Sequence, residues 1–397
     1  MDKLPLRGIQ IVEMSHMIMG PCCGMILSQL GADVIKVEPP PGDKTRALEG
    51  MGTSFFPLFN RGKRSLVLDV ATKSGRNALF RLLERSDVFI ENFKDETIMK
   101  SGLDGTSLTK HFPRLIIAAH KGFLSGPYEH RPALDEVVQM MAGLAYMTGS
   151  REVPLRVGAS VNDIMGGMFG VIGILAALRE REMNGKGSEI RIGLFENCLF
   201  SVAQHIVQFQ MTGVPVPPMP QRILCWPVYD IFTTRDDKRL FIAVTTDGQW
   251  KALCRTFGLD ALLADPDLTK VQQRIDARPR LLPPIADRLR QHDLEYLMAK
   301  LDDVSIPFAP INAPEELLDD PHVRRPGGLV TMIDEKGHAI DVPTLPLEFD
   351  RASIGRVSVV PSLGGDTFSI LTYLGYSESE IQELAKGRSL RPDRPPR

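Results

Sequence analysis

The first forty residues alternate between short apolar runs and one helical pattern, and this alternation restricts the possible folds more than any other feature. One apolar run ends near Met14, and a second covers Val34–Val37. Between them, Pro21 suits the first turn of a helix and Gly31 suits its end. Strand, crossover helix and strand form the unit of a parallel sheet, so we predict an α/β fold.

The alternation continues to about residue 192. Further strands are expected at Ser65–Asp69, Val88–Asn92, Leu115–Ala119 and Glu189–Ile192, with a helix at Gly75–Arg85. We therefore predict a doubly wound, Rossmann-like large domain that binds ligands at the carboxyl ends of its strands. The sequence has neither a G-x-G-x-x-G turn after the first strand nor a Walker loop, which disfavours nicotinamide and nucleoside-triphosphate cofactors.

Residues 164–182 carry the strongest helical pattern of the chain. Apolar side chains repeat there every three or four residues. Glycines interrupt the pattern at Gly166, Gly167, Gly170 and Gly173. Because each glycine lowers helix stability, we predict that another part of the backbone packs closely against this helix.

A proline-rich linker after about residue 215 marks a change of character. Val228–Thr234 and Arg239–Val244 alternate like the paired strands of a hairpin, and helical patterns then run to about Leu301. We predict a smaller α+β domain inserted into the large one. The expected ranges are 1–214 and 326–397 for the large domain and 215–325 for the small one.

The C-terminal part of the chain carries two more helical patterns, Asp366–Leu374 and Ser377–Leu384. Ser377 and Glu380 have the spacing of a capping box at the start of the second. Residues 391–397 are rich in proline and charge, and we expect them to be disordered.

Composition disfavours several classes of function. With 47 Lys and Arg against 49 Asp and Glu, the net charge is -2, so we expect no nucleic-acid partner. No uncharged apolar stretch reaches about 18 residues, so we expect no membrane partner. Five cysteines without a C-x-x-C pair, and histidines without ligand spacing, indicate neither a disulfide framework nor a metal site. The first residues lack a secretory pattern, so we expect a cytoplasmic protein.

Asp163, directly before the strongest helical pattern, is the first candidate for chemistry. It can cap the helix, because an Asp side chain accepts from the first free N–H groups. It can also be a nucleophile toward an acyl carbon if it lies beside a cleft. Asp135 opens another helical pattern and has the same two interpretations.

Other candidates lie around the first turn. His16 follows a strand, which is a ligand position in a doubly wound fold. Arg46, Lys63 and Arg64 can hold phosphates or be solvated surface charges. Four methionines cluster nearby and form either core or a soft wall around a ligand; they are Met14, Met17, Met19 and Met25.

From Leu4 to Tyr376 the chain resembles the class III CoA-transferase (CaiB/BaiF) family. This family includes formyl-CoA, carnitine and succinyl-CoA:glutarate CoA-transferases, and α-methylacyl-CoA racemase. The segments that carry the resemblance are Leu30–Glu38, Asn60–Ser65, Ile90–Phe93, Ser125–Pro127 and Gly143–Gly149. Together they are specific, although none is specific alone.

The resemblance implies a function, a site and an assembly. CoA passes from an acyl-CoA donor such as succinyl-CoA to a small carboxylic or dicarboxylic acid, through aspartyl anhydride and aspartyl-CoA thioester intermediates. Asp163 matches the family's nucleophile, which also caps the helix, and Asp135 matches an acidic residue of the site. No cofactor is implied beyond CoA, and relatives form interlaced homodimers. The implied CoA contacts are His16, Met17, Ile18, Met19, Leu68, Ala71, Asn92, Phe93, Lys100 and Arg131.

The chain departs from individual branches of the family. Ile18 replaces a glutamine of the formyl-CoA enzymes, and Pro39 replaces a basic residue for which Arg46 is a possible substitute. Racemases have a catalytic histidine where this chain has Leu134, although Asp163 and Asp247 match their acidic positions. A racemase and a non-catalytic acyl-CoA-binding protein therefore stay as alternatives.

Overall fold

The chain divides into two compact units. A computed structural model describes residues 4–221, 226–355 and 357–384. One unit, the large unit, comprises Met1–Pro220 and Arg324–Arg397, and the other, the small unit, comprises Gln221–Val323. The domain ranges expected from the sequence were 1–214 with 326–397, and 215–325. The expected disorder of residues 391–397 lies outside the described residues.

The large unit is built on a six-stranded sheet in the order β3-β2-β1-β4-β5-β6. All of its pairings are parallel, so the predicted α/β class is confirmed. The strand order runs outward in opposite directions from β1 and β4, which is the doubly wound arrangement. The strands are β1 Gln10–Met14, β2 Asp33–Glu38, β3 Arg64–Val67, β4 Val88–Glu91, β5 Ile116–Lys121 and β6 Glu189–Gly193.

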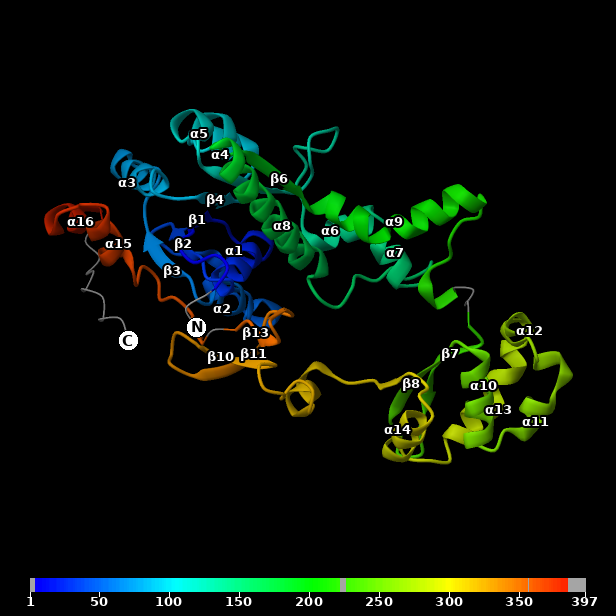
Figure 1. The fold of residues 1–397 in the computed structure, drawn as a ribbon. Helices are drawn as coiled ribbons and strands as arrows, with labels where there is room; N and C mark the ends of the chain where they lie inside the picture. The colour runs from blue at the N-terminus through cyan, green and yellow to red at the C-terminus, as the bar shows by residue number, and fades with distance from the viewer. Residues whose placement is uncertain (1–3, 222–225, 356, 385–397) are drawn as a thin grey trace. The chain divides into compact units, whose positions relative to one another are not determined.

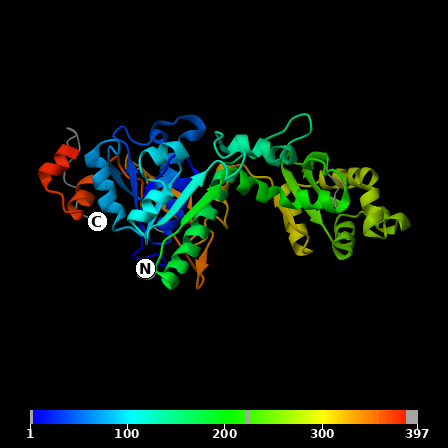
Figure 2. The same cartoon turned by 90° about the horizontal axis from the view of Figure 1, so that it is seen from above.

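Helices cover both faces of this sheet (Figure 1). One face packs against α1 Met19–Gln29 and α8 Val161–Asn184. The other face packs against α3 Lys73–Leu83, α4 Asp95–Lys100, α5 Gly105–His111, α15 Thr367–Tyr373 and α16 Glu378–Leu384. The C-terminal helices, red in Figures 1 and 2, therefore lie beside α3, far from them in sequence. Ser377 and Glu380 form the predicted capping box before α16.

The glycines of α8 lie against α1 and β5, which confirms the predicted close packing. A Cβ atom at Gly167 would lie 2.9 Å from the backbone oxygen of Met19 and 2.8 Å from the Cβ of Cys22. A Cβ at Gly170 would lie 2.5 Å from Nε2 of His120. Only a residue without a side chain fits at these contacts, so the glycines set the distance between α8 and its neighbours.

A buried charge network crosses the sheet below α1. Glu13 of β1 is fully buried, and its Oε2 lies 2.6 Å from Nζ of Lys63. Nζ of Lys36 lies 3.4 Å from Oε1 of Glu13 and 2.9 Å from Oδ2 of Asp43. A Cβ at Gly24 would overlap the Glu13 carboxylate, so this glycine makes room for the charge. Paired in this way, the buried charges tie β1, β2 and the start of β3 together.

A second, smaller sheet in the large unit was missed from the sequence. Its order is β11-β10-β14, and it packs on Phe56 of α2 Phe55–Asn60. The turn Asp334–Gly337 joins two of its strands and was an available hairpin signal. The strands here are β10 Leu329–Ile333, β11 Ala339–Pro343 and β14 Ser358–Val359, beside a two-stranded ribbon of β12 Glu348–Phe349 and β13 Ala352–Ser353. Short 3-10 helices cover Lys44–Ala47, Gly50–Gly52 and Met219–Gln221.

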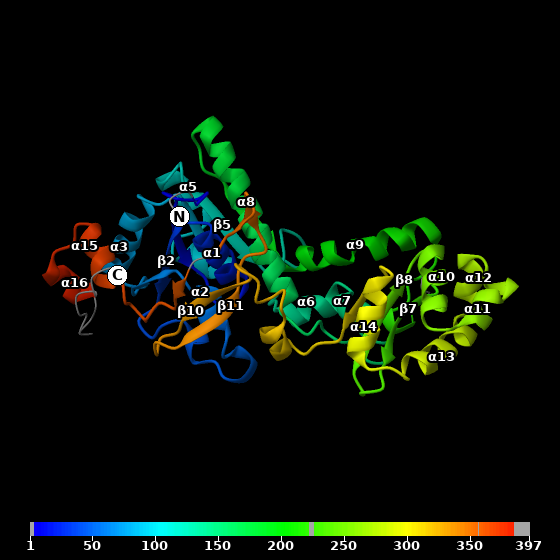
Figure 3. The same ribbon diagram turned by 60° about the horizontal axis from the view of Figure 1, so that its bottom comes forward.

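Three helices extend the large unit beyond the β6 edge. They are α6 Asp135–Met141, α7 Leu144–Thr148 and α9 Leu194–Thr212. Figure 3 shows α6 and α7 beside α9, and these helices also contact one another. The start of α8 meets α6 and α9 here, so this corner positions Asp163.

The small unit contains the predicted hairpin. β7 Val228–Thr233 and β8 Arg239–Val244 pair antiparallel, and β9 Phe308–Pro310 joins β8. Its core is formed by one face of this sheet and the helices around it. The helices are α10 Asp247–Thr256, α11 Asp260–Ala264, α12 Val271–Asp276, α13 Arg278–Leu289 and α14 Leu294–Asp303, with 3-10 turns at Pro266–Leu268 and Pro314–Asp319.

Among the described helices, α8 alone has the length and apolar composition of a membrane span. A helix that packs on the core of a sheet can have the same length and composition, and α8 packs on α1 and β5 through its glycines. The criterion is therefore weak for a single helix, and the expectation of no membrane partner stays a prediction.

Gly167→Ala should destabilise the large unit by about 1–3 kcal/mol, the usual cost of an added methyl group in a tightly packed contact. The new Cβ would meet the Met19 backbone, which cannot move as a flexible side chain can. Urea unfolding followed by circular dichroism measures the loss. Arg179→Ala is the matched control on the same helix, since that side chain is 72% exposed. Equal stability of the two variants would contradict the close packing.

Candidate active site

The loops after β1 and β4 meet at the point where the strand order reverses. The backbone N–H of His16 donates to Oδ1 of Asn92 at 3.0 Å, and Nδ2 of Asn92 donates to the carbonyl of His16 at 2.8 Å. The ring of Phe93 lies 5.8 Å from the ring of His16. Met17, which follows His16 in the loop after β1, has a φ of 64°, in the left-handed region, and its side chain is exposed. The structure thus brings four of the predicted CoA-binding residues together at the ligand position of a doubly wound sheet.

The other predicted CoA-binding residues have different environments. Ile18, Met19 and Leu68 have buried side chains, so their side chains belong to the core. Ala71, Lys100 and Arg131 are exposed. The guanidinium of Arg131 lies 4.2 Å from the ring centroid of Tyr128.

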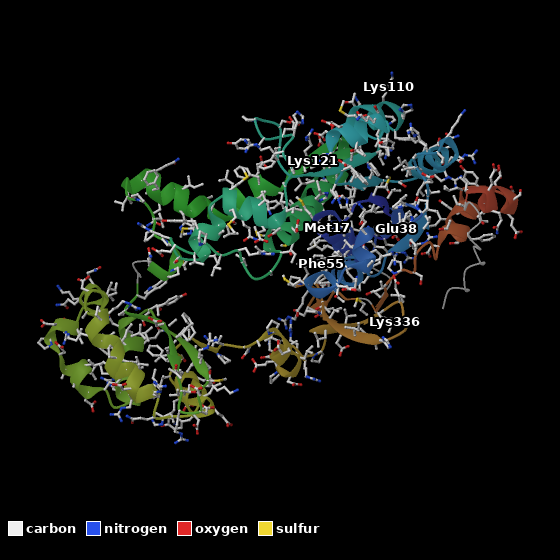
Figure 4. The ribbon with its side chains drawn as sticks, turned by 180° about the vertical axis from the view of Figure 1, so that it is seen from behind. Met17, Glu38, Phe55, Lys110, Lys121 and Lys336 are labelled. Carbon is white, nitrogen blue, oxygen red and sulfur yellow. The ribbon has the colours of Figure 1, made fainter. Side chains whose placement is uncertain are left out.

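The methionine cluster is mostly core. Met14, Met19 and Met25 are at most 7% exposed, whereas Met17 is 37% exposed. The interpretation of the cluster as a wall around a ligand is therefore wrong for the three buried residues. Figure 4 labels Met17 together with Glu38 and Lys121, the last residues of β2 and β5.

The proposed phosphate-binding role of Arg46 and Lys63 is wrong, and so is the alternative of solvated surface charges. Arg46 donates from Nε and Nη2 to the Glu38 carboxylate at 2.8 and 2.7 Å, and it also pairs with Glu335. Lys63 is buried against Glu13, and burial lowers its pKa to about 8. Arg64 is partly exposed and pairs with Asp33 and Asp366. These three cations therefore form ion pairs within the fold.

A second ion network fixes the loop after β4. Nζ of Lys121 lies 2.8 Å from Glu91 and from Asp95, and it donates to the carbonyl of Phe93 at 2.9 Å. Oε2 of Glu91 accepts from the N–H of Phe93 at 2.8 Å. The backbone of Phe93 is therefore held on both its donor and acceptor sides, beside Asn92 and His16.

Asp163 lies inside the first turn of α8, so the prediction that it caps the helix is wrong. The helix begins at Val161 with Ser160 at the N-cap, and neither Ser160 nor Asp163 accepts from the helix backbone. Asp135 of α6 caps α8 instead: its Oδ2 accepts from the N–H groups of Asn162 and Asp163, each at 3.0 Å. The cap thus comes from a residue 28 positions earlier in the chain.

Asp135 is surrounded by donors. Nε2 of Gln139 donates to its Oδ1, and Nη2 of Arg156 lies 3.7 Å from the same oxygen. Oε1 of Gln139 in turn accepts from the N–H of Val157 at 2.9 Å. Both oxygens of Asp135 are therefore acceptors, as in an ionised carboxylate.

Two asparagines anchor the other side of this turn. Nδ2 of Asn162 donates to the carbonyl of Leu194 at 3.0 Å. Nδ2 of Asn197 in α9 donates to the carbonyl of Asn162 at 2.7 Å and to its Oδ1 at 2.8 Å. The first turn of α8 is thus bonded to α6 on one side and α9 on the other.

The Asp163 carboxyl group itself has no hydrogen bond or ion pair with any residue in the described part of the chain. Burial is the largest cause that raises its pKa, to about 7, and the charge of Asp135 adds to it, while Arg156 acts in the opposite direction. A carboxylate with a raised pKa is a stronger base and a better nucleophile, once ionised, than an ordinary Asp carboxylate. The two acids therefore have different environments: Asp135 is held by donors, whereas the Asp163 carboxyl group is not.

Sequence reasoning missed Gln139, Arg156 and Asn197. Gln139 follows Asp135 by four residues, which is the spacing of a side-chain pair on one helix face, so this signal was available. Arg156 and Asn197 reach the site only through the fold, and no local spacing connects them to Asp163.

Asp135→Asn should lower the pKa of Asp163, because it removes the negative charge that adds to the effect of burial. The value should stay above the ordinary range of an Asp, since burial is the larger cause and persists. The titration is measured by NMR on protein with ¹³C-labelled Asp carboxyl groups, with Asp163→Asn to assign the resonance. A pKa that stays near 7 would show that the two carboxyl groups are not coupled.

Comparison with known proteins shows the family to which the chain belongs. The model of CoA-transferase family III matches residues 6–367. The chain is similar to a succinate–glutarate CoA-transferase of Agrobacterium fabrum, at 31% identity over 94% of this chain and 96% of the relative. It is also similar to a succinyl-CoA:mesaconate CoA-transferase of Haloarcula hispanica, at 32% identity over 84% and 86% of the two chains.

Among solved structures, a CaiB/BaiF family protein from Brucella suis aligns with a TM-score of 0.84 and 32% identity, over 94% of this chain and all of that one. At this coverage the likeness includes parts of both units. The resemblance noted in the sequence is thereby confirmed. The chain belongs to CoA-transferase family III and is an enzyme that transfers CoA.

Proposed function

We propose that the enzyme moves CoA between small dicarboxylic acids, with succinyl-CoA as donor, through covalent intermediates on Asp163. The observation that carries the proposal is the unpartnered Asp163 carboxyl group at the start of α8, where the backbone N–H of Asp163 is fixed by its hydrogen bond to Asp135. The names of two relatives support the substrate class, since succinate, glutarate and mesaconate are all dicarboxylates.

The proposed reaction proceeds by acyl exchange at three carbonyl groups, those of the donor, of Asp163 and of the acceptor. The Asp163 carboxylate attacks the donor thioester, which releases CoA thiolate and leaves a mixed anhydride. The thiolate attacks the aspartyl carbonyl, the donor acid leaves, and an aspartyl-CoA thioester remains. The acceptor carboxylate then attacks the aspartyl thioester, which releases CoA thiolate and leaves a second mixed anhydride. The thiolate attacks the acceptor carbonyl of this anhydride, which gives the acceptor CoA thioester and regenerates the Asp163 carboxylate. Each step is oxygen–sulfur acyl transfer, which uses no metal or redox cofactor.

The racemase alternative has less support in the structure. Leu134, at the position of the racemase histidine, is 62% exposed and cannot exchange a proton. The Asp247 carboxylate forms an ion pair with Arg274, a buried arginine that also donates to the carbonyls of Leu268 and Thr269. A carboxylate held by a guanidinium is a poorer base than one that is unpartnered.

Asp163→Asn should abolish CoA transfer from succinyl-CoA to a panel of dicarboxylic acids, because an amide cannot attack the thioester. In the native enzyme, hydroxylamine or borohydride should trap an intermediate at Asp163, mapped by mass spectrometry of peptides. The rate should fall below about pH 7, where Asp163 is protonated.

Glu180→Gln, an exposed change on the same helix, is the control for this variant. Turnover in Asp163→Asn, or turnover without modification of Asp163, would contradict the proposal. Exchange of the α-proton of an acyl-CoA with deuterium, with no acceptor acid present, would indicate a racemase. CoA-ester binding with neither activity would indicate a binding protein.

We propose further that two chains form an interlaced homodimer in the cytoplasm. The support is a broad set of exposed apolar side chains on α8 and α9, more than a monomer usually leaves in contact with water. On α8 the set is Met168, Ile172, Leu175 and Met183, and on α9 it is Leu199, Phe200, Ile206, Val207, Phe209 and Met211. A second copy of the chain is the proposed occupant of this surface.

Ile172→Glu should reduce the mass in solution from that of a dimer toward a monomer, because it places a charge within the apolar surface. Light scattering coupled to size exclusion measures the mass, and circular dichroism checks the fold. Met51→Glu is the control, since Met51 is 76% exposed and lies outside α8 and α9. A native enzyme that is monomeric at micromolar concentration would rule the dimer out.

A further inference from the structure

Arg156 stands on the segment that leads into α8, and its guanidinium is only partly engaged. Nε donates to the carbonyl of Val157 at 3.2 Å, and Nη2 donates to the carbonyl of Ala159 at 3.3 Å. Nη2 also lies 3.7 Å from Oδ1 of Asp135, and Nη1 lies 3.8 Å from Oε2 of Glu136. Its side chain is 27% exposed, so it lies at the boundary between the buried acids and solvent.

Gln139 links Asp135 to the segment that leads into α8. It is fully buried, its amide N–H donates to Asp135, and its carbonyl accepts from the N–H of Val157. Asp135 then reaches the N–H groups of Asn162 and Asp163. In the segment 156–160, the N–H of Val157 is thus bonded to Gln139, and the side chain of Arg156 donates to two carbonyls of the same segment. The segment continues directly into the turn that carries Asp163.

We propose that Arg156 is a positioning residue of the transfer reaction, whose guanidinium holds the segment entering α8 and balances the charge of Asp135 beside Asp163. This inference rests on the proposed role of Asp163 as the nucleophile. Arg156 acts through Asp135 and through the backbone, and it forms no bond to the reacting atoms.

The surroundings of Asp163 leave Arg156 as the cation that acts on it. Asp135 of α6 contributes a negative charge, and Glu136, next to Asp135, competes for the guanidinium. The thiols of Cys22 in α1 and Cys198 in α9 also lie nearby, but burial raises their pKa values to about 12 and about 11. Both thiols are therefore neutral near pH 7, and Arg156 is the cation that lowers the pKa of Asp163.

The test is the pH dependence of transfer. Arg156→Gln should move the acidic limb of the rate profile to higher pH by about one unit, because a nearby opposite charge normally favours the carboxylate by one unit or more. The ¹³C titration of Asp163 in the free enzyme should move by the same amount. Arg156→Lys keeps the charge and should keep the limb within a few tenths of a unit, at a reduced kcat.

Two more variants make the result decisive. Arg151→Gln, an exposed arginine in the same loop, is the control and should leave profile and titration unchanged. Glu136→Gln should move the limb to lower pH, because it removes a competing negative charge. Its side chain is 58% exposed, so this variant tests the proposal even if Arg156→Gln does not fold.

Each failure has its own signature. A limb and a titration that do not move in Arg156→Gln, or in Glu136→Gln, would overturn the role of Arg156. So would an Arg156→Lys variant that loses stability and activity to the same extent as Arg156→Gln with an unshifted profile. Activity retained in Asp163→Asn would instead overturn the nucleophile, whatever the Arg156 variants do.

Discussion

Two hydrogen bonds from the backbone of α8 to one oxygen of Asp135 are the interaction on which the site depends. The first N–H groups of a helix have no partner inside it, and at most helix starts a nearby side chain satisfies them. Here the acceptor comes from α6, so a segment far away in the sequence completes the start of α8. The side chain of Asp163 is then spared from capping and stays available for chemistry.

The glycine face of α8 makes this meeting possible. With α1 and β5 in direct contact at Gly167 and Gly170, the helix axis lies close to the sheet, and its first turn reaches the corner between α6 and α9. His120 shows how tight the contact is. The ring is fully buried, and burial lowers its pKa to about 4, so the ring is neutral against Gly170.

The sequence was sufficient where the information is local. Period-two and helical patterns predicted the strands of the parallel sheet, the hairpin of the small unit and the glycine contacts of α8. It was insufficient where a partner lies far away in the chain. Asp163 looked like a helix cap because the distant acceptor, Asp135, cannot be seen in local sequence. Lys63 looked like a surface charge because its partner, Glu13, becomes a neighbour only in the fold.

The two acids show how one fold separates positioning from reaction. Transferring a carboxylate into the protein interior is unfavourable unless hydrogen bonds or opposite charges offset the cost, and Asp135 receives both. Asp163 receives no hydrogen bond or ion pair, and the charge of Arg156 only partly offsets its burial, so near neutral pH its charged form is no longer strongly favoured over the acid. A carboxylate bound by strong donors would be held back from an acyl carbon, whereas one without them is not. The same hydrogen bonds that stabilise Asp135 also cap the start of α8, so the side chain of Asp163 is not needed as a cap.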